Sequence, residues 1–239
     1  MSYWQGVRYL VQQDIKNARW KNLTFIVFIL YVALFSYTSF IGAVVEGIEL
    51  DSLVTEYMLL ILFSMIGLIA THLYTIGDMK RDLLGERLIY WRTLPIKQDQ
   101  IVWSRIIGVT LYTIASIILY YGLISIAMVL TDVSFDYVPL ALHGLQFLAI
   151  SLVMNFAFLC CEMVFSFKTY SIISWCFPFV LIGTVILYYV LGEYSLLQGL
   201  DVLARRHPLI VIIISPLVII ASIFVAHRVI TPNFRKRNI

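Results

Sequence analysis

Cysteine and histidine are the residue types in this chain whose side chains most often support catalysis or bind metal ions. The 239-residue sequence has three cysteines and four histidines. The cysteines are odd in number, two are adjacent, and all fall in or beside apolar segments, so they predict small buried side chains rather than a disulfide framework or a metal site. The histidines are widely separated. The seven residues are Cys160, Cys161, Cys176, His72, His143, His207 and His227.

Signatures of a self-contained enzyme are absent from the sequence. It has no phosphate-binding GxxxxGK[ST] loop, no HExxH metal motif and no GxSxG nucleophile motif. The apolar segments carry neutral Tyr, Ser and Thr residues but no charge near their centres, although proton and ion pathways are usually marked by charges. The neutral residues are typical of helix packing in lipid, and equally of a weakly polar pathway for an amphipathic substrate. We therefore expect no catalytic, cofactor-binding or metal-binding residue in this chain.

The elements that carry these residues are predicted to cross a membrane. Of the residues, 61% are hydrophobic and 13% are charged, whereas soluble domains carry about 25% charged residues. Six apolar runs are long enough to cross a hydrocarbon core of about 30 Å as helices. The prediction is an all-α polytopic membrane protein, a single domain over residues 1–239, with no role in nucleic-acid binding. The six spans are 23–45, 57–76, 106–130, 139–160, 170–191 and 208–226.

The distribution of basic residues predicts the orientation. With six spans, one side of the membrane carries 15 of the 17 Lys and Arg residues, and the other side carries Arg205 and Arg206. Cytoplasmic loops are enriched in Lys and Arg. We therefore expect a plasma-membrane protein with both termini in the cytoplasm, including a tail over residues 227–239.

Two further helices are predicted outside the spans. In segment 1–22, Trp4, Val7 and Val11 fall on one helical face and basic residues on the other, which is typical of a helix in the headgroup plane; the alternative is a solvated leader. Segment 192–207, on the external side, has a leucine stripe and an Asp201–Arg205 pair at i,i+4 spacing. The stripe consists of Leu196, Leu197, Leu200 and Leu203.

The loop over residues 77–105, between the second and third spans, has the densest charge. Its first half is predicted to be a short charged helix that ends at Pro95, because the residue before a proline avoids helical geometry. A second helix then runs from Ile96 toward the third span, with Asp99 near its start, where an acidic residue is favoured. Exposed aromatic and arginine residues on the first helix suit a protein contact, or alternatively anchoring at the membrane surface.

This loop resembles that of ABC-2 type permeases, the membrane subunits of ATP-binding-cassette exporters. The resemblance covers Lys80 to Arg105, with Leu94-Pro95-Ile96 at the turn and Ser104-Arg105 opening the third span. The six spans, the N-terminal amphipathic helix and the external helix before the last span are also features of that family. The loop departs from the family pattern in two respects. Glu86 lies closer to the Leu-Pro-Ile turn than the family's acid usually does, and Gly85 precedes Glu86 where the family's glycine often follows the acid.

The resemblance implies a permease subunit that exports an amphipathic or hydrophobic substrate such as a peptide, an antibiotic or a lipid-like molecule. It implies a second permease chain, identical or related, and two cytoplasmic ATPase subunits that bind ATP and Mg²⁺, so this chain itself is not an enzyme. The loop helix around Asp82–Thr93 would dock on the ATPase. The alternatives are an accessory or sensory membrane protein and a membrane-embedded enzyme acting on lipids or peptides. The coupling residues implied are Asp82, Glu86, Arg87, Tyr90, Trp91, Arg92, Thr93, Leu94 and Pro95.

Overall fold

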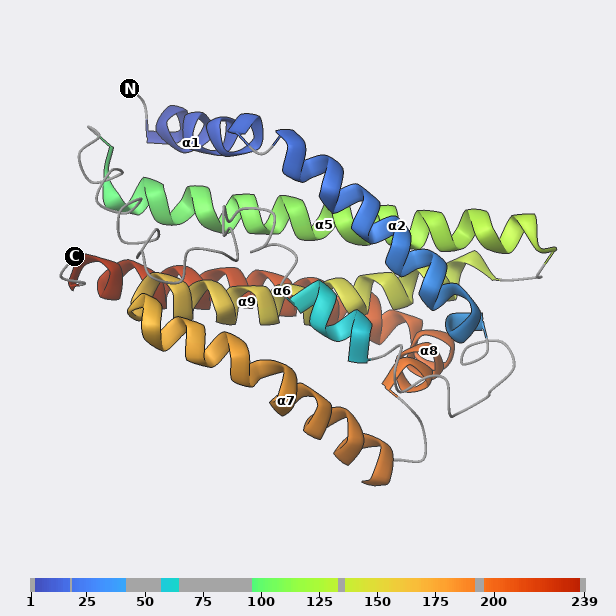
Figure 1. Ribbon diagram of the computed structural model, residues 1–239. Coiled ribbons are helices and arrows are strands. Elements are labelled where there is room, and N and C mark those ends of the chain that lie inside the picture. Colours follow the sequence, from blue (N-terminus) through green and yellow to red (C-terminus); the bar gives the residue numbers. More distant parts are fainter. Residues whose placement is uncertain are drawn as a thin grey trace.

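A computed structural model shows the chain as an elongated helical bundle (Figure 1). The structure describes residues 3–17, 19–41, 57–64, 96–132, 136–191 and 196–236. Nearly all of these residues are helical and none forms a strand, which confirms the predicted all-α class for this part of the chain. The helices are α1 (Tyr3–Asn17), α2 (Arg19–Ile41), α5 (Gln98–Leu130), α6 (Tyr137–Val164), α7 (Phe167–Leu191), α8 (Leu196–Arg206) and α9 (Pro208–Lys236), with a further helical stretch over 57–64.

Four of these helices are long and apolar enough to cross a membrane, namely α5, α6, α7 and α9. The longest, α5, has 33 residues, which at 1.5 Å per residue is about 50 Å. That length exceeds the roughly 20 residues that a bilayer core needs, so α5 extends beyond the core. Four such helices in one chain indicate a multi-pass membrane protein. The number six stays a prediction, because the structure describes only 19–41 and 57–64 in the region of the first two spans.

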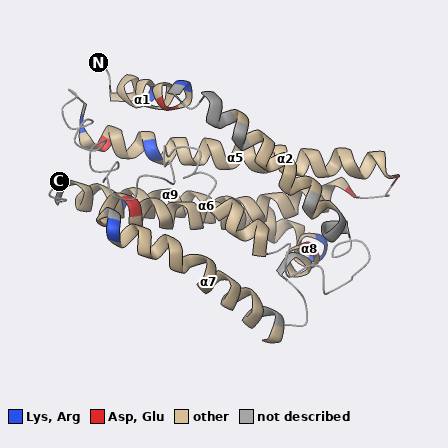
Figure 2. Cartoon of the chain, in the orientation of Figure 1, with Lys and Arg blue, Asp and Glu red and all other residues tan. Residues whose placement is uncertain are grey.

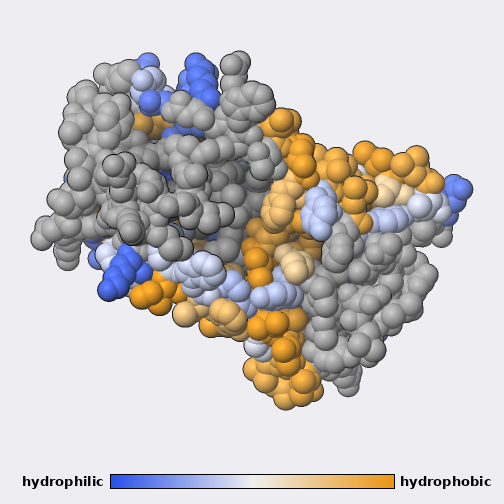
Figure 3. Space-filling view, in the orientation of Figure 1, coloured by the Kyte–Doolittle hydropathy of each residue, from blue (hydrophilic) through white to orange (hydrophobic). Residues whose placement is uncertain are grey.

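The exterior of the bundle is suited to lipid rather than to water. Large apolar side chains are exposed on α7 and α9, including Phe179 at 74% and Leu209 at 72% exposure. Figure 3 shows hydrophobic residues over most of the visible middle of the bundle, with hydrophilic ones toward its two tips. A soluble monomer rarely exposes so continuous an apolar surface. The surface therefore supports the same assignment as the helix lengths.

Charged residues occupy the two ends of the bundle. In Figure 2, Lys, Arg, Asp and Glu lie near the end where both termini are found, or around α8 and the α5–α6 connection at the opposite end. We call the first the terminal end and the second the α8 end. Among the described side chains of the helices, none between these two ends is charged. This separation is the arrangement expected of helices that cross a bilayer, because a charge in the hydrocarbon core is costly.

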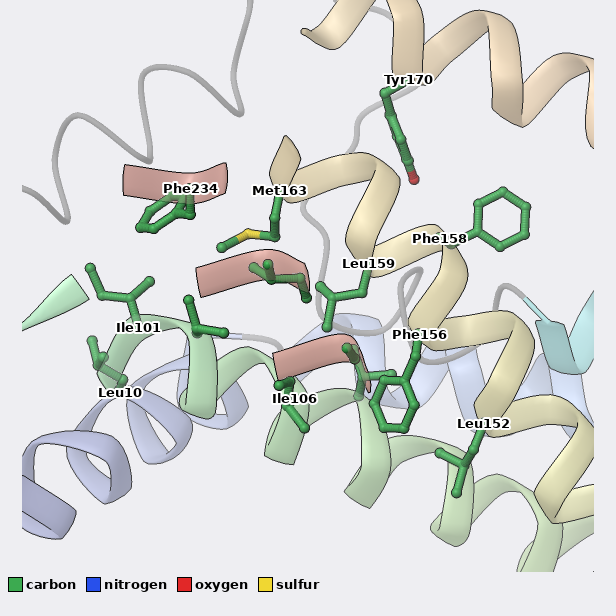
Figure 4. Close-up of a cluster of buried hydrophobic side chains, with 14 residues drawn as sticks. Leu10, Ile101, Ile106, Leu152, Phe156, Phe158, Leu159, Met163, Tyr170 and Phe234 are labelled. Carbon is green, nitrogen blue, oxygen red and sulfur yellow. The ribbon is translucent and has the colours of Figure 1, made fainter. Parts of the chain in front are cut away.

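One hydrophobic core lies toward the terminal end and joins five helices. Leu10 of α1, Ile101 of α5, Phe156 of α6 and Phe234 of α9 are all at most 4% exposed and belong to one cluster, into which Tyr170 of α7 also packs (Figure 4). Helix α1 lies alongside the first part of α5 (Figure 1). Of the apolar face predicted for α1, Val7 and Val11 are buried against the bundle, whereas Trp4 is 58% exposed. The position of α1 in the headgroup plane stays a prediction.

A second core lies between α2, residues 57–64, α5 and α6. Phe63 is its centre, with ring centroids 5.3 Å from Tyr120 and 5.4 Å from Phe147, both edge to face. Asn155 of α6 is fully buried beside it, and its Nδ2 donates to the Phe63 carbonyl at 2.6 Å and to the Ser151 carbonyl at 2.8 Å. Interhelical amide bonds of this kind join helices in lipid, where apolar contact alone gives little driving force.

Candidate functional site

The first turns of α5 contact the neighbouring helices at the terminal end of the bundle through several polar side chains. Helix α5 begins at Gln98, within the segment 77–105 predicted as the coupling loop and close to Ile96, where its second helix was predicted to start. Its start is capped because the backbone N–H of Lys97 donates to Oε1 of Gln100 at 2.9 Å. Asp99 lies in the first turn, as predicted from the favourable helix dipole. Three residues of this segment contact other helices: Gln100 contacts α1, Asp99 contacts α1 and α9, and Arg105 contacts α1 and α6.

Arg105 joins α5 to α6 and α1 through buried charges. Its Nη2 donates to Oε1 of Glu162 at 3.2 Å, with the two side chains 1% and 0% exposed. Its Nη1 lies 3.8 Å from Oδ2 of Asp14 on α1, which is 18% exposed. One cation therefore lies between two carboxylates. We call Asp14, Arg105 and Glu162 the ionic cluster.

A buried ionic cluster fixes geometry more than it adds stability. Burying each ion costs several kcal/mol of hydration, and good contacts roughly offset this cost, but removing one partner costs about 3–5 kcal/mol because a charge is left buried. The relative positions of α1, α5 and α6 are therefore strongly specified at this level.

Asp99 joins α5 to α9 and to the start of α1. Its Oδ1 lies 3.0 Å from Nε2 of His227 on α9, and its Oδ2 accepts a hydrogen bond from the Tyr3 hydroxyl. The His227 ring stacks on Trp103 with centroids 4.6 Å apart. The Gln100 amide adds a contact, because its Nε2 donates to the Tyr3 carbonyl at 2.6 Å. We call Tyr3, Asp99, Gln100 and His227 the docking cluster.

The docking cluster keeps Tyr3 as a neutral hydrogen-bond donor. Burial raises the pKa of the Tyr3 phenol well above its usual range, and the hydrogen bond to Asp99 and the charge of that carboxylate raise it further. A phenol with a raised pKa stays protonated throughout the physiological range. The Tyr3 hydroxyl therefore donates to Asp99 under all ordinary conditions.

Gly6 is the point at which α1 approaches α5 most closely. A Cβ atom placed on Gly6 would lie 2.9 Å from Nε2 of Gln100, a distance that real Cβ contacts essentially never show. The Gln100 amide occupies that space because it bonds both Lys97 and Tyr3. A side chain at position 6 would therefore have to displace the Gln100 amide from these two bonds.

The predicted coupling residues, from Asp82 to Pro95, lie outside the described residues.

The predicted external helix is present as α8, over Leu196–Arg206. Its predicted i,i+4 pair is confirmed, because Nε of Arg205 lies 2.7 Å from Oδ2 of Asp201. The face of α8 that is buried includes Asp201 and Ala204, whereas Leu203 is 37% exposed. The stripe residues Leu200 and Leu203 line a pocket between α6, α8 and α9. The side chains of Leu196 and Leu197 are outside the described part.

Sequence reasoning missed both clusters at the terminal end. The fourth span was predicted to end at Cys160 and the third to begin at Ile106, so Glu162 and Arg105 fell just outside the apolar runs, and no pairing between them was predicted. The available signal was an acid and a base embedded in apolar neighbours, Cys161-Glu162-Met163 and Arg105-Ile106-Ile107. His227 is one of four widely separated histidines in the sequence, and its partner Asp99 is 128 residues distant. Within the described residues, no group of three or more His, Cys, Asp or Glu side chains has metal-site geometry.

The fold and these clusters define a class: a multi-pass α-helical membrane protein whose N-terminal helix is fixed to the start of its longest helix. Comparisons of this chain with protein-family models, with curated protein sequences and with solved structures found no match. What the chain does is therefore argued below from its residues and geometry.

Proposed function

We propose that this chain is the membrane-spanning permease subunit of an ATP-driven exporter of the ABC-2 type. In this proposal it works with a second permease chain and with two cytoplasmic ATPase subunits that bind ATP and Mg²⁺. The observation that carries the proposal is the position of the two clusters. They lie on the first turns of α5, the helix that directly follows the loop predicted to contact the ATPase.

The proposed coupling runs from the loop into the bundle through α5. The ATPase would contact Tyr90, Trp91 and Arg92 and move the loop helix as ATP binds and is hydrolysed. Because the chain continues from Pro95 into α5 within three residues, that motion reaches the first turns of α5. The ionic cluster carries it to α6 and α1, and Asp99 with His227 carries it to α9. Each nucleotide state would then favour one arrangement of the bundle.

The chemistry of the bundle agrees with an uncharged or amphipathic cargo. The described spans contain buried hydroxyl and amide residues, such as Thr113, Ser116 and Asn155, but no charge in their middle parts. A pathway of this composition suits a peptide, an antibiotic or a lipid-like molecule better than an ion. The proposed location is the plasma membrane, with both termini in the cytoplasm.

Co-purification is the experiment that tests the proposal. The chain would be expressed with ABC ATPases of the same genome, beginning with any encoded beside it, and extracted in detergent. We expect one of them to co-elute with it in equal amount and to hydrolyse ATP. If none of the ATPases tested co-elutes with the chain, either with or without nucleotide, the proposal is wrong. An accessory or sensory membrane protein and a membrane-embedded enzyme then become the leading alternatives.

The coupling residues are tested with a double variant. Trp91→Ala with Arg92→Ala is expected to reduce ATPase co-elution, or to leave ATP hydrolysis that no longer responds to substrate, while membrane insertion is unchanged. The matched control is Trp175→Ala with Arg206→Ala, which removes the same two residue types from exposed positions away from the terminal end. Equal behaviour of the two double variants would contradict the role of the loop.

A further inference from the structure

A pocket of about 380 Å³ lies between α6, α8 and α9 at the α8 end of the bundle. Its walls are almost entirely apolar, with Ala149 and Val153 from α6, Leu203 from α8 and Ile214 and Val218 from α9. This size and lining are typical of a pocket for a small ligand. Val153, Leu203, Ile214 and Val218 are between 37% and 52% exposed, so the pocket opens on the outer apolar surface that faces lipid.

Gln146 is the exception among the apolar lining residues. Its side chain is 6% exposed, and neither Oε1 nor Nε2 has a hydrogen-bond partner in the described structure. Leaving a buried amide unsatisfied costs about 1–3 kcal/mol. A water molecule is a poor partner here, because a buried water needs two to four polar contacts, and the only other polar residue that lines the pocket is Ser215. The amide therefore indicates a ligand that brings its own polar group into an apolar space.

The depth of Gln146 in the membrane restricts the kinds of ligand that can place a polar group beside its amide. The same pocket is lined by Ile210 and Val211, in the first turn of α9, and by Leu200 of α8. Helix α8 is short and packs across this level through Ala204, which is in contact with Leu142 and Val211. Where a spanning helix begins beneath a short amphipathic helix, the polar headgroup layer meets the hydrocarbon core. Gln146 thus lies near the depth at which a phospholipid carries its ester groups.

We propose that this pocket binds one phospholipid, with an acyl chain between α6 and α9 and an ester oxygen paired with the Gln146 amide. The Nε2 group would donate to the ester carbonyl, and the chain would cover the apolar walls. A pure hydrocarbon would leave the amide unsatisfied, and a water-soluble ligand would leave the exposed apolar rim in water. The inference requires only that the chain lies in a membrane, so it does not depend on the proposed transport function.

Photocrosslinking tests the proposal directly. The full-length chain would be reconstituted in vesicles of dioleoyl phosphatidylcholine containing a few per cent of a phosphatidylcholine with a diazirine near the carboxyl end of one acyl chain. We expect adducts concentrated on peptides 146–154 and 210–218, several-fold above those on α7, whose surface is equally apolar. Adducts spread evenly over α7 and α9 would overturn the proposal, because they would reflect ordinary bilayer contact.

Two variants and one control sharpen the result. Gln146→Leu keeps the side-chain size and removes the amide, and Ala149→Phe fills the pocket from one helical turn away. Both are expected to lower the pocket adducts several-fold, whereas Ala157→Phe, on an exposed face of α6 outside the pocket, should leave them unchanged. Unchanged adducts in both pocket variants would overturn the assignment. Loss of pocket adducts from the wild type on dimerisation would show that a second copy of the chain covers the pocket, and would also overturn it.

Discussion

Arg105 and Glu162 are 57 residues apart in the sequence, yet Nη2 of the arginine lies 3.2 Å from Oε1 of the glutamate, and neither side chain is more than 1% exposed. With Asp14 3.8 Å from the same guanidinium, the pair joins α1, α5 and α6 at the terminal end. Because both charged groups lose their hydration on burial, each is stabilised mainly by the opposite charge of its partner. The stability of this end should therefore respond strongly and non-additively to changes in the pair.

The first prediction is a double-mutant cycle on this pair. Arg105→Met should lower the free energy of unfolding by about 3–5 kcal/mol, because it leaves the Glu162 carboxylate buried without its cation. Combining it with Glu162→Leu should restore most of the loss, because the two apolar side chains fill the space without a charge. The measurement is SDS titration in detergent micelles, followed by tryptophan fluorescence.

The exposed pair on α8 provides the control for this cycle. Arg205 is 43% exposed and bonds Asp201 within one helix, so Arg205→Met should cost at most about 1 kcal/mol. A strictly additive Arg105 and Glu162 cycle, or equal losses from Arg105→Met and Arg205→Met, would show that the ionic cluster does not hold the helices together.

The second prediction concerns the close approach of α1 to α5. Gly6→Leu should release α1 from the bundle, because the new side chain displaces the Gln100 amide from its bonds to Lys97 and Tyr3. Release is measured as maleimide labelling of a cysteine at Val11, which is 9% exposed when α1 is docked. We expect labelling to rise from near background to near completion.

Gly183→Leu is the matched change, because nothing lies within 4 Å of a Cβ atom at that position. It should leave labelling at Val11 as in the parent. Equal labelling of the Gly6 and Gly183 variants would mean that α1 is not held against Gln100.

The helices were predictable from the sequence, whereas their contacts were not. Apolar runs predict α5, α6, α7 and α9 because only helices satisfy the backbone in lipid, and the leucine pattern of segment 195–206 predicted α8 and its Asp201–Arg205 pair. The length of an apolar run predicts where a helix crosses the membrane core. It does not predict that Glu162, two residues beyond such a run, contacts Arg105. That pairing depends on how α5 and α6 are rotated against each other, and a single sequence carries no record of it.

The surroundings of Gln146 were also not predictable from the sequence, although this residue lies inside a predicted span and not beyond its end. It lies within the predicted span 139–160, where a lone amide among apolar residues is an ordinary helix-packing residue. Only the arrangement of α6, α8 and α9 shows that Gln146 lines a pocket and that its buried amide has no hydrogen-bond partner in the described structure. The predicted coupling residues around Trp91 remain predictions, because they lie outside the described structure.

The third prediction tests the bond between α6 and residues 57–64. Asn155→Leu removes the donor to the Phe63 carbonyl, which is 2.6 Å from Nδ2, and should lower the free energy of unfolding by about 1 kcal/mol, the usual size of an interhelical bond in lipid. Thr184→Val is the control, because its hydroxyl bonds only the Val180 carbonyl of its own helix at an exposed position. If both variants unfold at the same SDS concentration as the parent, Asn155 does not join the two elements.

The last prediction concerns the orientation of the bundle. Gln98 begins α5 and Leu130 ends it, so these two positions are separated by the length of the helix, about 50 Å. Ser134 follows Leu130 by four residues in the sequence. A helix of that length places its ends on opposite sides of a bilayer. The basic residues at the terminal end predict that Gln98 is cytoplasmic and Ser134 external. In a variant without Cys160, Cys161 and Cys176, a cysteine at Ser134 should react with a membrane-impermeant maleimide in intact cells.

A cysteine at Gln98 should react with the same reagent only after the membrane is permeabilised. Two further positions make the test independent of local exposure. Asn233, exposed near the end of α9, should behave as Gln98 does, and Arg206, exposed at the end of α8, should behave as Ser134 does. The opposite pattern at all four positions would reverse the orientation, and the loop around Trp91 would then lie outside the cell, where no ATPase could reach it. Labelling of Gln98 and Ser134 from the same side would instead contradict the assignment of α5 as a membrane span, because the two ends of one spanning helix lie at opposite membrane surfaces.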